Sequence, residues 1–339
     1  MLRIALPSNT DWQEPTLSFL DSCGLPVQRV TARRYTGRMP AVPGAVVLFQ
    51  RAADIPRQIE AGAAEVGLAG LDQYLESHPD DGPGTVLIES LGFRGADLAV
   101  AVPESWDHVS SGADLVDLAN RRKGEGSPIR VATKYPRLTE KYMQARGAAN
   151  FSIIEAGGTL EAAPAMGYAD LIVDITSTGN TLRENQLKTI ADGTVVRSQA
   201  CLFANRDLLG RNDDALAGVR ILLELIEARL RASGYYSIIA NIRGDSPSQI
   251  AGHIQDHPEI AGIEGPTVSQ VFSKEGETGW YAVTMVVGRD KVITALDHLR
   301  AIGGNGIIVF PTTYVFENKC SAYDNLLEQL GRAPVETSV

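Results

Sequence analysis

Cysteine is scarce in this 339-residue sequence, which has only Cys23, Cys201 and Cys320, all far apart in the chain. An odd number of cysteines without a CxxC pair predicts neither a disulfide framework nor a zinc site. The sequence also lacks an apolar run of 18 residues, and its first residues, MLRIALPSNTDW, lack the apolar core of a signal peptide. We therefore expect a cytoplasmic protein that does not span a membrane.

Basic residues are also few: the sequence has 31 Lys and Arg residues and 41 Asp and Glu residues, so its formal net charge is −10. Such a balance argues against a nucleic-acid surface and against binding to anionic membranes. A polyanionic ligand would need a local basic pocket. The hydrophobic fraction of 44% is ordinary for a globular protein, and the length predicts two or three domains.

The first two thirds of the chain alternate short apolar runs with helical patterns, which predicts two α/β lobes with parallel or mixed sheets. The polar segment 121–128 is expected to separate them. We assign residues 1–102 with 193–211 to the first lobe and 103–192 to the second, with hinges near Pro103 and Asp192. The second lobe has three transitions from strand to loop to helix, whose helices are expected at 138–146, 159–166 and 182–190.

The last third begins with an amphipathic pattern from Asp213 to Ala232, followed by Gly234. Apolar residues at helical spacing predict a connecting helix over 213–234. Residues 235–330 then follow the order β-α-β-β-α-β, which is typical of a ferredoxin-like module.

One segment of the second lobe carries a pattern suited to a sugar phosphate. The apolar run that begins at Leu171 ends in Asp174 and leads into a loop of small polar residues, Thr176, Ser177, Thr178, Gly179, Asn180 and Thr181. Hydroxyl groups, unhindered backbone N–H groups and a following helix start are suited to phosphate, and Asp174 could accept hydrogen bonds from ribose hydroxyls. Loops of this composition also occur as ordinary turns and helix caps.

Several longer motifs resemble one enzyme family: RVATKYPRLTEKY from Arg130, GGTLEAAP from Gly157, GYADLIVDITSTGNTL from Gly167 and EGPTVSQVF from Glu264. Together they resemble the long form of ATP phosphoribosyltransferase, the family that opens histidine biosynthesis. The resemblance implies a two-lobed, periplasmic-binding-protein-like α/β core with a C-terminal ferredoxin-like regulatory domain. It also implies transfer of ribose 5-phosphate from phosphoribosyl pyrophosphate to N1 of ATP, with release of pyrophosphate and help from Mg²⁺.

The resemblance assigns roles to individual residues of this chain. Asp174 and the loop 176–181 fall on the family's site for the donor's ribose 5-phosphate, and Lys134 and Tyr135 lie in its ATKYP motif at the cleft. Glu161 and Asp170 lie in motifs near the nucleotide. The transfer needs phosphate anchoring with magnesium or basic residues rather than a nucleophile. The sequence does not identify residues that hold the metal.

The first lobe departs from the family pattern. Ser8, Asn9, Thr10 and Asp11 stand where the family has a basic Asn-Lys-Gly-Arg loop, so two cations are missing and one is replaced by an acid. Asp97 stands where arginine is common, although Arg94 lies close by, and Leu71 precedes Asp72 where a basic residue is common. Arg51 remains as a candidate cleft cation. We include Arg51, Asp72 and Asp11 among the expected cleft residues.

Three functions stay open at this point. The first is ATP phosphoribosyl transfer; the second is a diverged paralogue that uses a less anionic acceptor in specialised metabolism; the third is a catalytically silent regulatory subunit. The missing cations favour the second over the third, because the complete TSTGNTL loop is retained. The resemblance further implies an amino-acid effector and a homo-oligomer, either a dimer or a hexamer.

Overall fold

The computed structural model describes residues 1–31, 33–123, 126–272 and 277–333. Within them the chain forms two compact units. The core unit contains Met1–Asp21, Leu25–Arg220 and Leu326–Ala333, and the C-terminal unit contains Ser22–Gly24 and Ile221–Asn325. The two units are described separately below.

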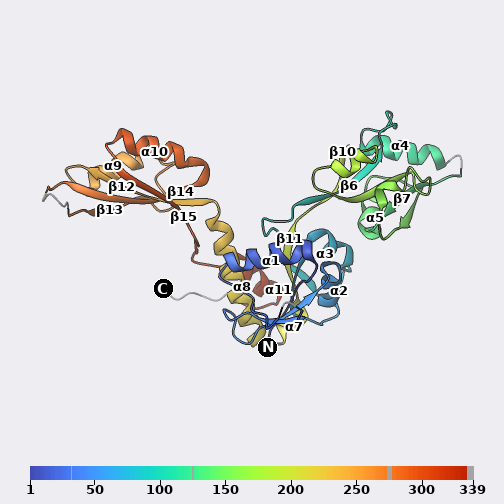
Figure 1. Cartoon of the computed structure of the whole chain (residues 1–339), viewed down its shortest axis with the longest axis horizontal. Helices are drawn as coiled ribbons and strands as arrows, with labels where there is room; N and C mark the ends of the chain where they lie inside the picture. Colours follow the sequence, from blue (N-terminus) through green and yellow to red (C-terminus); the bar gives the residue numbers. More distant parts are fainter. Residues whose placement is uncertain (32, 124–125, 273–276, 334–339) are drawn as a thin grey trace. The chain divides into compact units, whose positions relative to one another are not determined.

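The first lobe of the core unit is built on a six-stranded mixed sheet (Figure 1). Its strands lie in the order β2 (Thr36–Arg38), β3 (Val46–Gln50), β1 (Arg3–Pro7), β4 (Val66–Gly70), β11 (Ala200–Asn205) and β5 (Gly84–Ile88). Strand β1 runs parallel to β3 and β4, whereas β11 runs antiparallel to β4 and β5. Every residue of β4 and β11 is buried, as expected of central strands covered on both faces.

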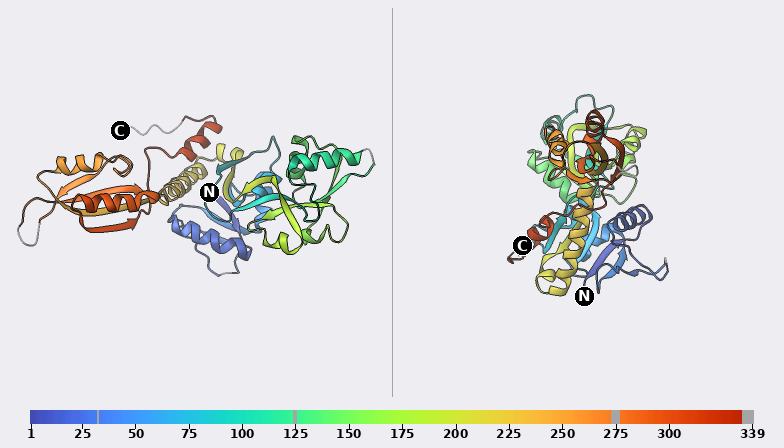
Figure 2. Two further views of the ribbon diagram at one scale, coloured as in Figure 1. Left: turned by 90° about the horizontal axis from the view of Figure 1, so that it is seen from above. Right: turned by 90° about the vertical axis from the view of Figure 1, so that its left-hand side faces the viewer.

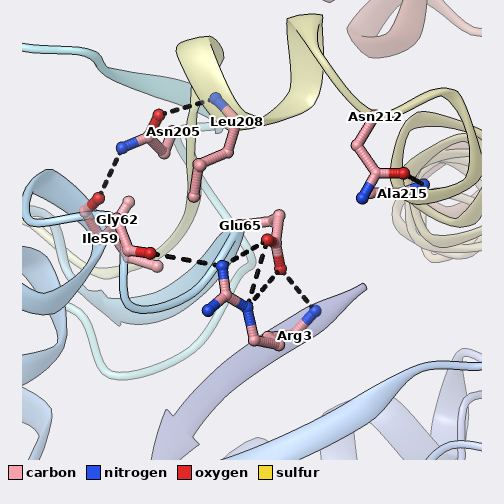
Figure 3. Close-up of polar contacts among 8 residues, drawn as sticks. All are labelled: Arg3, Ile59, Gly62, Glu65, Asn205, Leu208, Asn212 and Ala215. Carbon is pink, nitrogen blue, oxygen red and sulfur yellow. Dashed lines mark hydrogen bonds and ion pairs between the residues drawn. The ribbon is translucent and has the colours of Figure 1, made fainter. Parts of the chain in front are cut away.

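Polar contacts join the ends of the central strands β1 and β11 to neighbouring loops and turns (Figure 3). The Arg3 guanidinium donates to both carboxylate oxygens of Glu65, and the backbone N–H of Arg3 donates to the same carboxylate at 2.7 Å. The buried Asn205 accepts a hydrogen bond from Leu208 N–H and donates one to Ile59 O at 2.8 Å. These bonds satisfy a carboxylate and an amide that would be costly to bury alone.

The second lobe has a five-stranded sheet of its own. Its strands lie in the order β10 (Leu187–Ser198), β6 (Ala96–Pro103), β9 (Leu171–Thr176), β7 (Ile129–Thr133) and β8 (Phe151–Glu155). Successive side chains of β6 enter different cores: Leu98, Val100 and Val102 pack in one apolar cluster and Ala101 in another. This alternation follows from the two-residue period of a strand and shows that both faces of the sheet are covered.

The predicted lobe boundaries need correction. Strand β6 pairs with β9 and β10, so residues 96–102 and 193–198 belong to the second lobe. The chain therefore passes between the lobes at residues 89–95 and at Gln199, and the hinges expected at Pro103 and Asp192 lie within second-lobe structure. An apolar run such as LAVAVP fits either sheet, because the sequence of one strand does not encode its partner.

The predicted linker 121–128 also lies within the second lobe. Arg121–Lys123 form the last turn of α4 (Gly112–Lys123), and β7 follows at Ile129. Residues 124 and 125 of this segment lie outside the described residues.

The core unit's other helices are mostly short. The first lobe contains α1 (Thr10–Ser22), α2 (Ile55–Glu60), α3 (Leu71–Ser77) and α7 (Arg206–Gly210), and the second contains α5 (Pro136–Ala145) and α6 (Asn180–Glu184). Two helix predictions are wrong. The segment 159–166 forms only a 3-10 turn at Leu160–Ala162, and 182–190 contains the end of α6 followed by β10. Gln186, with a φ of 57°, marks that change of structure.

The C-terminal unit confirms the ferredoxin-like module. Its sheet has the order β13 (Thr267–Gln270), β14 (Trp280–Gly288), β12 (Tyr235–Arg243) and β15 (Asn305–Pro311), with antiparallel neighbours throughout. Figure 1 shows α9 (Pro247–Gln255) and α10 (Val292–Ala301) on one face of this sheet. The predicted connecting helix is also confirmed: Figure 2 shows α8 (Asp213–Ala232) as one continuous helix.

The predicted end of this module at residue 330 needs correction. Helix α11 (Ser321–Gln329) follows the module, and residues 326–333 belong to the core unit. Gln329 accepts a hydrogen bond from Thr85, and Arg332 pairs with Asp213 at 2.7 Å. Within the described residues, no helix is both long and apolar enough to cross a membrane.

Candidate functional site

The polar loop of the second lobe follows the carboxyl end of β9. The strand ends at Thr176, Gly179 adopts a φ of 69°, and α6 begins at Asn180. The Gly179 N–H donates to Thr176 Oγ1 at 3.1 Å, which closes the turn. This left-handed backbone conformation favours glycine. Four loop residues are exposed, namely Ser177, Thr178, Asn180 and Thr181.

The loop encloses a small cavity of about 100 Å³, lined by residues 174–182 together with Glu161. Glu161 lies on the 3-10 turn that begins at Leu160. The structure thus brings Glu161 next to Asp174 and the loop. Asn180 accepts a hydrogen bond from the Arg183 guanidinium, which adds a cation to this loop that the sequence analysis had not singled out.

Asp174 is largely withdrawn from water, and burial raises its pKa above the ordinary value for aspartate. The N–H of Ile175, which donates to Asp174 Oδ1 at 2.8 Å, and the charge of Lys134 oppose this shift, whereas the charges of Glu161 and Asp72 add to it. A carboxylate whose charged form is poorly compensated by the protein can accept hydrogen bonds from a ligand.

A second carboxylate, Asp72, joins the two lobes. It is buried at 5% exposure, and its oxygens accept a hydrogen bond from Tyr135 Oη at 2.6 Å and one from the Ser198 hydroxyl. Burial and the charge of Asp72 together raise the pKa of Tyr135, so the phenol stays protonated as the donor. Its carboxylate thus anchors Tyr135 and Ser198, and its expected contact with substrate stays a prediction.

Glu76 reinforces the junction between the lobes. Its carboxylate accepts hydrogen bonds from the backbone N–H groups of Arg137 and Leu138, at 2.9 and 3.0 Å. Helix α5 therefore receives its N-terminal cap from α3 in the other lobe. The loop before α5 carries Lys134 and Tyr135, so this contact fixes both residues.

A cavity of about 380 Å³ lies where these residues meet. Its lining residues come from both lobes: Trp12, Asp72, Gln73, Arg94, Gly95, Ala96, Lys134, Tyr135, Asp174, Ile175, Ser177 and Ser198. This volume is in the range of small-molecule sites. The structure brings Lys134, Tyr135 and Asp174 together here. It also adds Trp12, which no motif indicated, and Arg94, which the sequence offered only as an arginine close to Asp97.

Asp170 does not reach these cavities. It immediately precedes β9, at the opposite end from Asp174, and its carboxylate pairs with Arg130 at 3.1 Å and Arg122 at 3.4 Å. Burial would raise the pKa of Asp170, but the hydrogen bonds and charge of Arg130, with the charge of Arg122, outweigh it and lower the pKa. These partners give Asp170 a structural role, and its expected place near the nucleotide stays a prediction.

Arg51 and Asp11 also differ from expectation. Arg51 is an exposed residue that follows β3, and Asp11 is an exposed residue in the first turn of α1. Neither belongs to the linings of the two cavities above. Helix α1 begins at Thr10, and Trp12, which follows Asp11, lines the larger cavity. An acid in the first turn is favourable for the helix dipole.

The fold and this site define a class: a two-lobed α/β protein that gathers residues of both lobes, and a loop of small polar residues, around a polar cleft. The model for the family "ATP phosphoribosyltransferase" matches residues 51–228, and the model for "HisG, C-terminal domain" matches residues 232–314. The chain belongs to the ATP phosphoribosyltransferase family.

Similar proteins agree with this membership. The chain is 36% identical to "ATP phosphoribosyltransferase 2, chloroplastic" of Arabidopsis thaliana, over 97% of this chain and 81% of that protein. It is 34% identical to the ATP phosphoribosyltransferase of Bradyrhizobium sp. (strain ORS 278), over 94% of this chain and 95% of that protein. Among solved structures, the fold resembles a chain of the ATP phosphoribosyl transferase (HisG:HisZ) complex from Thermotoga maritima, with a TM-score of 0.50 and 24% identity, covering 67% of this chain and 99% of that one.

Proposed function

We propose that this protein transfers ribose 5-phosphate from phosphoribosyl pyrophosphate to N1 of ATP and releases pyrophosphate, the first step of histidine biosynthesis. The observation that carries the proposal is family membership over nearly the whole chain together with the complete loop from Asp174 to Thr181. A binding subunit without activity would have no need of both a loop and a cleft of this kind.

The loop 176–181 would bind the donor's 5-phosphate. Exposed hydroxyls of Ser177, Thr178 and Thr181 and the backbone N–H groups of the turn are donors, and phosphate oxygens are acceptors. Asp174 would accept hydrogen bonds from the ribose hydroxyls. Because Asp174 must be ionised for this task, its raised pKa sets a lower pH limit for donor binding.

The reaction breaks the bond between the sugar's C1 and the diphosphate oxygen, and forms a bond between C1 and N1 of the acceptor. Positive charge develops on the sugar and negative charge on the leaving diphosphate. Fixed charges that face these groups stabilise that separation. Lys134 lines the larger cavity beside Asp174 and would face the diphosphate. Glu76 and Asp72 position the loop that holds Lys134.

Magnesium fits this donor set. Among the described residues, no group of three or more His, Cys, Asp or Glu side chains gathers into a cation site. Mg²⁺ commonly takes one or two carboxylates, several waters and the phosphates of a substrate. Asp174 and Glu161 line one cavity and would be those carboxylates. When bound, the cation neutralises diphosphate charge.

The C-terminal unit would hold the effector. A cavity of about 850 Å³ in this unit includes Arg243 and Asp245 in its lining, which suits the carboxylate and the ammonium group of an amino acid. A homo-oligomer, either a dimer or a hexamer, and a cytoplasmic location remain our expectations.

The reaction is tested directly. Purified protein is incubated with phosphoribosyl pyrophosphate, Mg²⁺ and ATP, while pyrophosphate release and the ribosylated nucleotide are measured together. We expect both products in equal amounts, and neither without ATP, without Mg²⁺ or in Asp174→Asn. Absence of both products at high enzyme concentration, with donor binding intact, would contradict ATP as the acceptor.

A further inference from the structure

The tryptophan at position 12 occupies an unusual place in the core unit. Trp12 lies in the first turn of α1, directly after Asp11, and is half-buried. A Cβ built on Gly70 would lie 3.4 Å from Cη2 of Trp12 and would collide with the Asp72 carboxylate. The absence of a side chain at Gly70 therefore leaves room for the indole beside Asp72, at the junction of the two lobes.

Arg94 lies over this indole. The guanidinium carbon is 5.0 Å from the ring centroid of Trp12, which is within cation–π range. The backbone of Arg94 has a φ of 59°, a left-handed conformation that favours glycine, and glycines stand at positions 92 and 95. Such a conformation at an arginine persists only where the surroundings hold it.

The surroundings of Arg94 do hold it. The backbone that precedes Arg94 is tied to β11, because Leu91 N–H donates to Ala200 O and Ala200 N–H donates to Phe93 O, both at 3.0 Å. The Phe93 ring packs against Phe19 of α1 with a centroid separation of 5.1 Å. Two aromatic contacts with α1 therefore fix the segment from which Arg94 projects.

The other two tryptophans provide a comparison within the chain. Trp106 and Trp280 also lie beneath arginines, at 5.9 and 6.0 Å, and neither tryptophan is among the residues that line the cavities near the loop. Trp12 and Arg94 both line the 380 Å³ cavity, together with Lys134 and Asp174. The shared cavity, rather than the aromatic contact alone, distinguishes the Trp12–Arg94 pair.

We infer that Trp12 and Arg94 form the acceptor platform of this enzyme, an inference that rests on the proposed function. Trp12 supplies an aromatic surface for the purine ring, and Arg94 supplies positive charge for the phosphates of the nucleotide. The pair compensates for the cations absent from residues 8–11, where this chain has no lysine or arginine. Both groups are held in place before a ligand arrives, which lowers the entropic cost of binding.

The first experiment measures the fluorescence of the Trp12 indole. In the Trp106→Phe/Trp280→Phe background, Trp12 is the remaining tryptophan, and its fluorescence is titrated with adenosine, AMP, ATP and inorganic pyrophosphate. We expect the three purine ligands to quench the emission with saturation and pyrophosphate to leave it almost unchanged. Saturable ATP binding, measured by calorimetry, without a change in Trp12 emission would overturn the inference, as would the absence of nucleotide binding.

The second experiment separates stacking from charge by calorimetry. Trp12→Leu removes base stacking, so we expect it to lower the affinities for adenosine and for ATP alike, by about tenfold. Trp12→Phe should retain most of both affinities. Arg94→Gln is expected to lower the affinity for ATP by about tenfold or more and the affinity for adenosine much less. Arg94→Lys should recover part of the ATP affinity. The matched controls, Trp106→Leu and Arg197→Gln, should leave all affinities unchanged.

These outcomes are distinct from those of the proposed reaction. If the wild type releases no pyrophosphate but ATP quenches Trp12 and Arg94→Gln weakens ATP, the reaction fails and the platform stands. If the wild type converts ATP, and if Trp12→Leu and Arg94→Gln have the same KM for ATP as the wild type while circular dichroism shows that both are folded, the inference is wrong. The KM for phosphoribosyl pyrophosphate should stay within about twofold in both variants, because the donor loop is untouched.

Discussion

Asp170 and Asp174 lie near opposite ends of strand β9 in the second lobe, and their surroundings shift their pKa values in opposite directions. Asp170 precedes β9 and pairs with Arg130 and Arg122, which lower its pKa. Asp174, four residues on, is partly buried near the carboxyl end of β9, and burial raises its pKa although the Ile175 N–H and the charge of Lys134 oppose the shift. The surroundings of Asp170 favour its charged form, whereas those of Asp174 disfavour it.

This difference separates the carboxylate that we propose as a ligand for the donor from one that arginines hold in place. Both residues lie in the same segment, GYADLIVDITSTGNTL, and both were expected to contact substrate. Of the two, Asp174 lines the cavity with the loop. Stability and binding should therefore respond to the two carboxylates in opposite ways.

The largest effect is expected for donor binding in Asp174→Asn. The variant loses the charged group that accepts hydrogen bonds from the ribose hydroxyls, and each hydrogen bond to a charged group contributes about 1.5–3 kcal/mol. The affinity for phosphoribosyl pyrophosphate should therefore fall by about a hundredfold or more. Titration calorimetry measures this affinity. Asp170→Asn should bind the donor like the wild type, and equal affinities in all three proteins would remove the distinction.

Stability should change next, in Asp170→Asn. The substitution removes the carboxylate that accepts hydrogen bonds from the backbone and the guanidinium of Arg130, whose side chain is 40% exposed, and we expect a loss of about 1–2 kcal/mol, measured by urea unfolding. The control is Asp80→Asn, whose exposed carboxylate pairs with Arg137 and Lys141 and should change stability less than Asp170→Asn does. An Asp170 variant as stable as the wild type would show that this ion pair contributes nothing.

Loss of one loop hydroxyl should have a smaller effect on binding. Thr181→Ala removes one neutral donor from the phosphate loop, and about 1 kcal/mol corresponds to roughly a fivefold loss of donor affinity. Thr189→Ala, an exposed residue on β10, is the matched control. A Thr181 variant that binds the donor as tightly as the control would mean that this hydroxyl does not contact the phosphate.

The smallest effect is expected in the pH dependence of stability. The lowered pKa of Asp170 stabilises the fold above the ordinary aspartate pKa of about 3.9, and this stability is lost as the pH falls through the folded-state value. The raised pKa of Asp174 acts in reverse: its contribution is present at low pH and is lost as the pH rises through the folded-state value.

Melting curves between about pH 2 and about pH 8 test this contrast, because Asp170 titrates below the ordinary aspartate pKa of about 3.9 and Asp174 titrates above it. Asp174→Asn should melt slightly above the wild type at neutral pH and converge with it on acidification. Asp170→Asn should melt below the wild type at neutral pH, and the gap should narrow on acidification. The same sign for both variants at neutral pH would contradict the comparison.

Local patterns in the sequence were enough to predict several features of the fold and of the candidate site. The alternation of strands with helical segments predicted two α/β lobes, the apolar spacing of 213–232 predicted α8, and the element order of the last third predicted the ferredoxin-like module. Asp174 and the loop after it were recognisable because a strand end, small residues and a helix start are neighbours in the chain. These features depend on residues within a few positions of one another.

Other features required the tertiary structure. Whether β6 joins the first or the second sheet depends on hydrogen bonds to β9 and β10, which are distant in sequence. The role of Asp170 depends on Arg130, 40 residues away, and that of Asp72 on Tyr135, 63 residues away. Trp12 and Arg94 share a cavity only because residues 91–93 are held to β11 and α1.

The sequence by itself determined the lobes, the C-terminal module, the polar loop and the family, because local hydrophobic spacing and contiguous motifs encode them. The tertiary structure alone decided which carboxylates are neutralised and which aromatic and cationic groups reach the cleft. The physical reason is that charge compensation and cavity lining are set by groups brought close in space from distant parts of the chain.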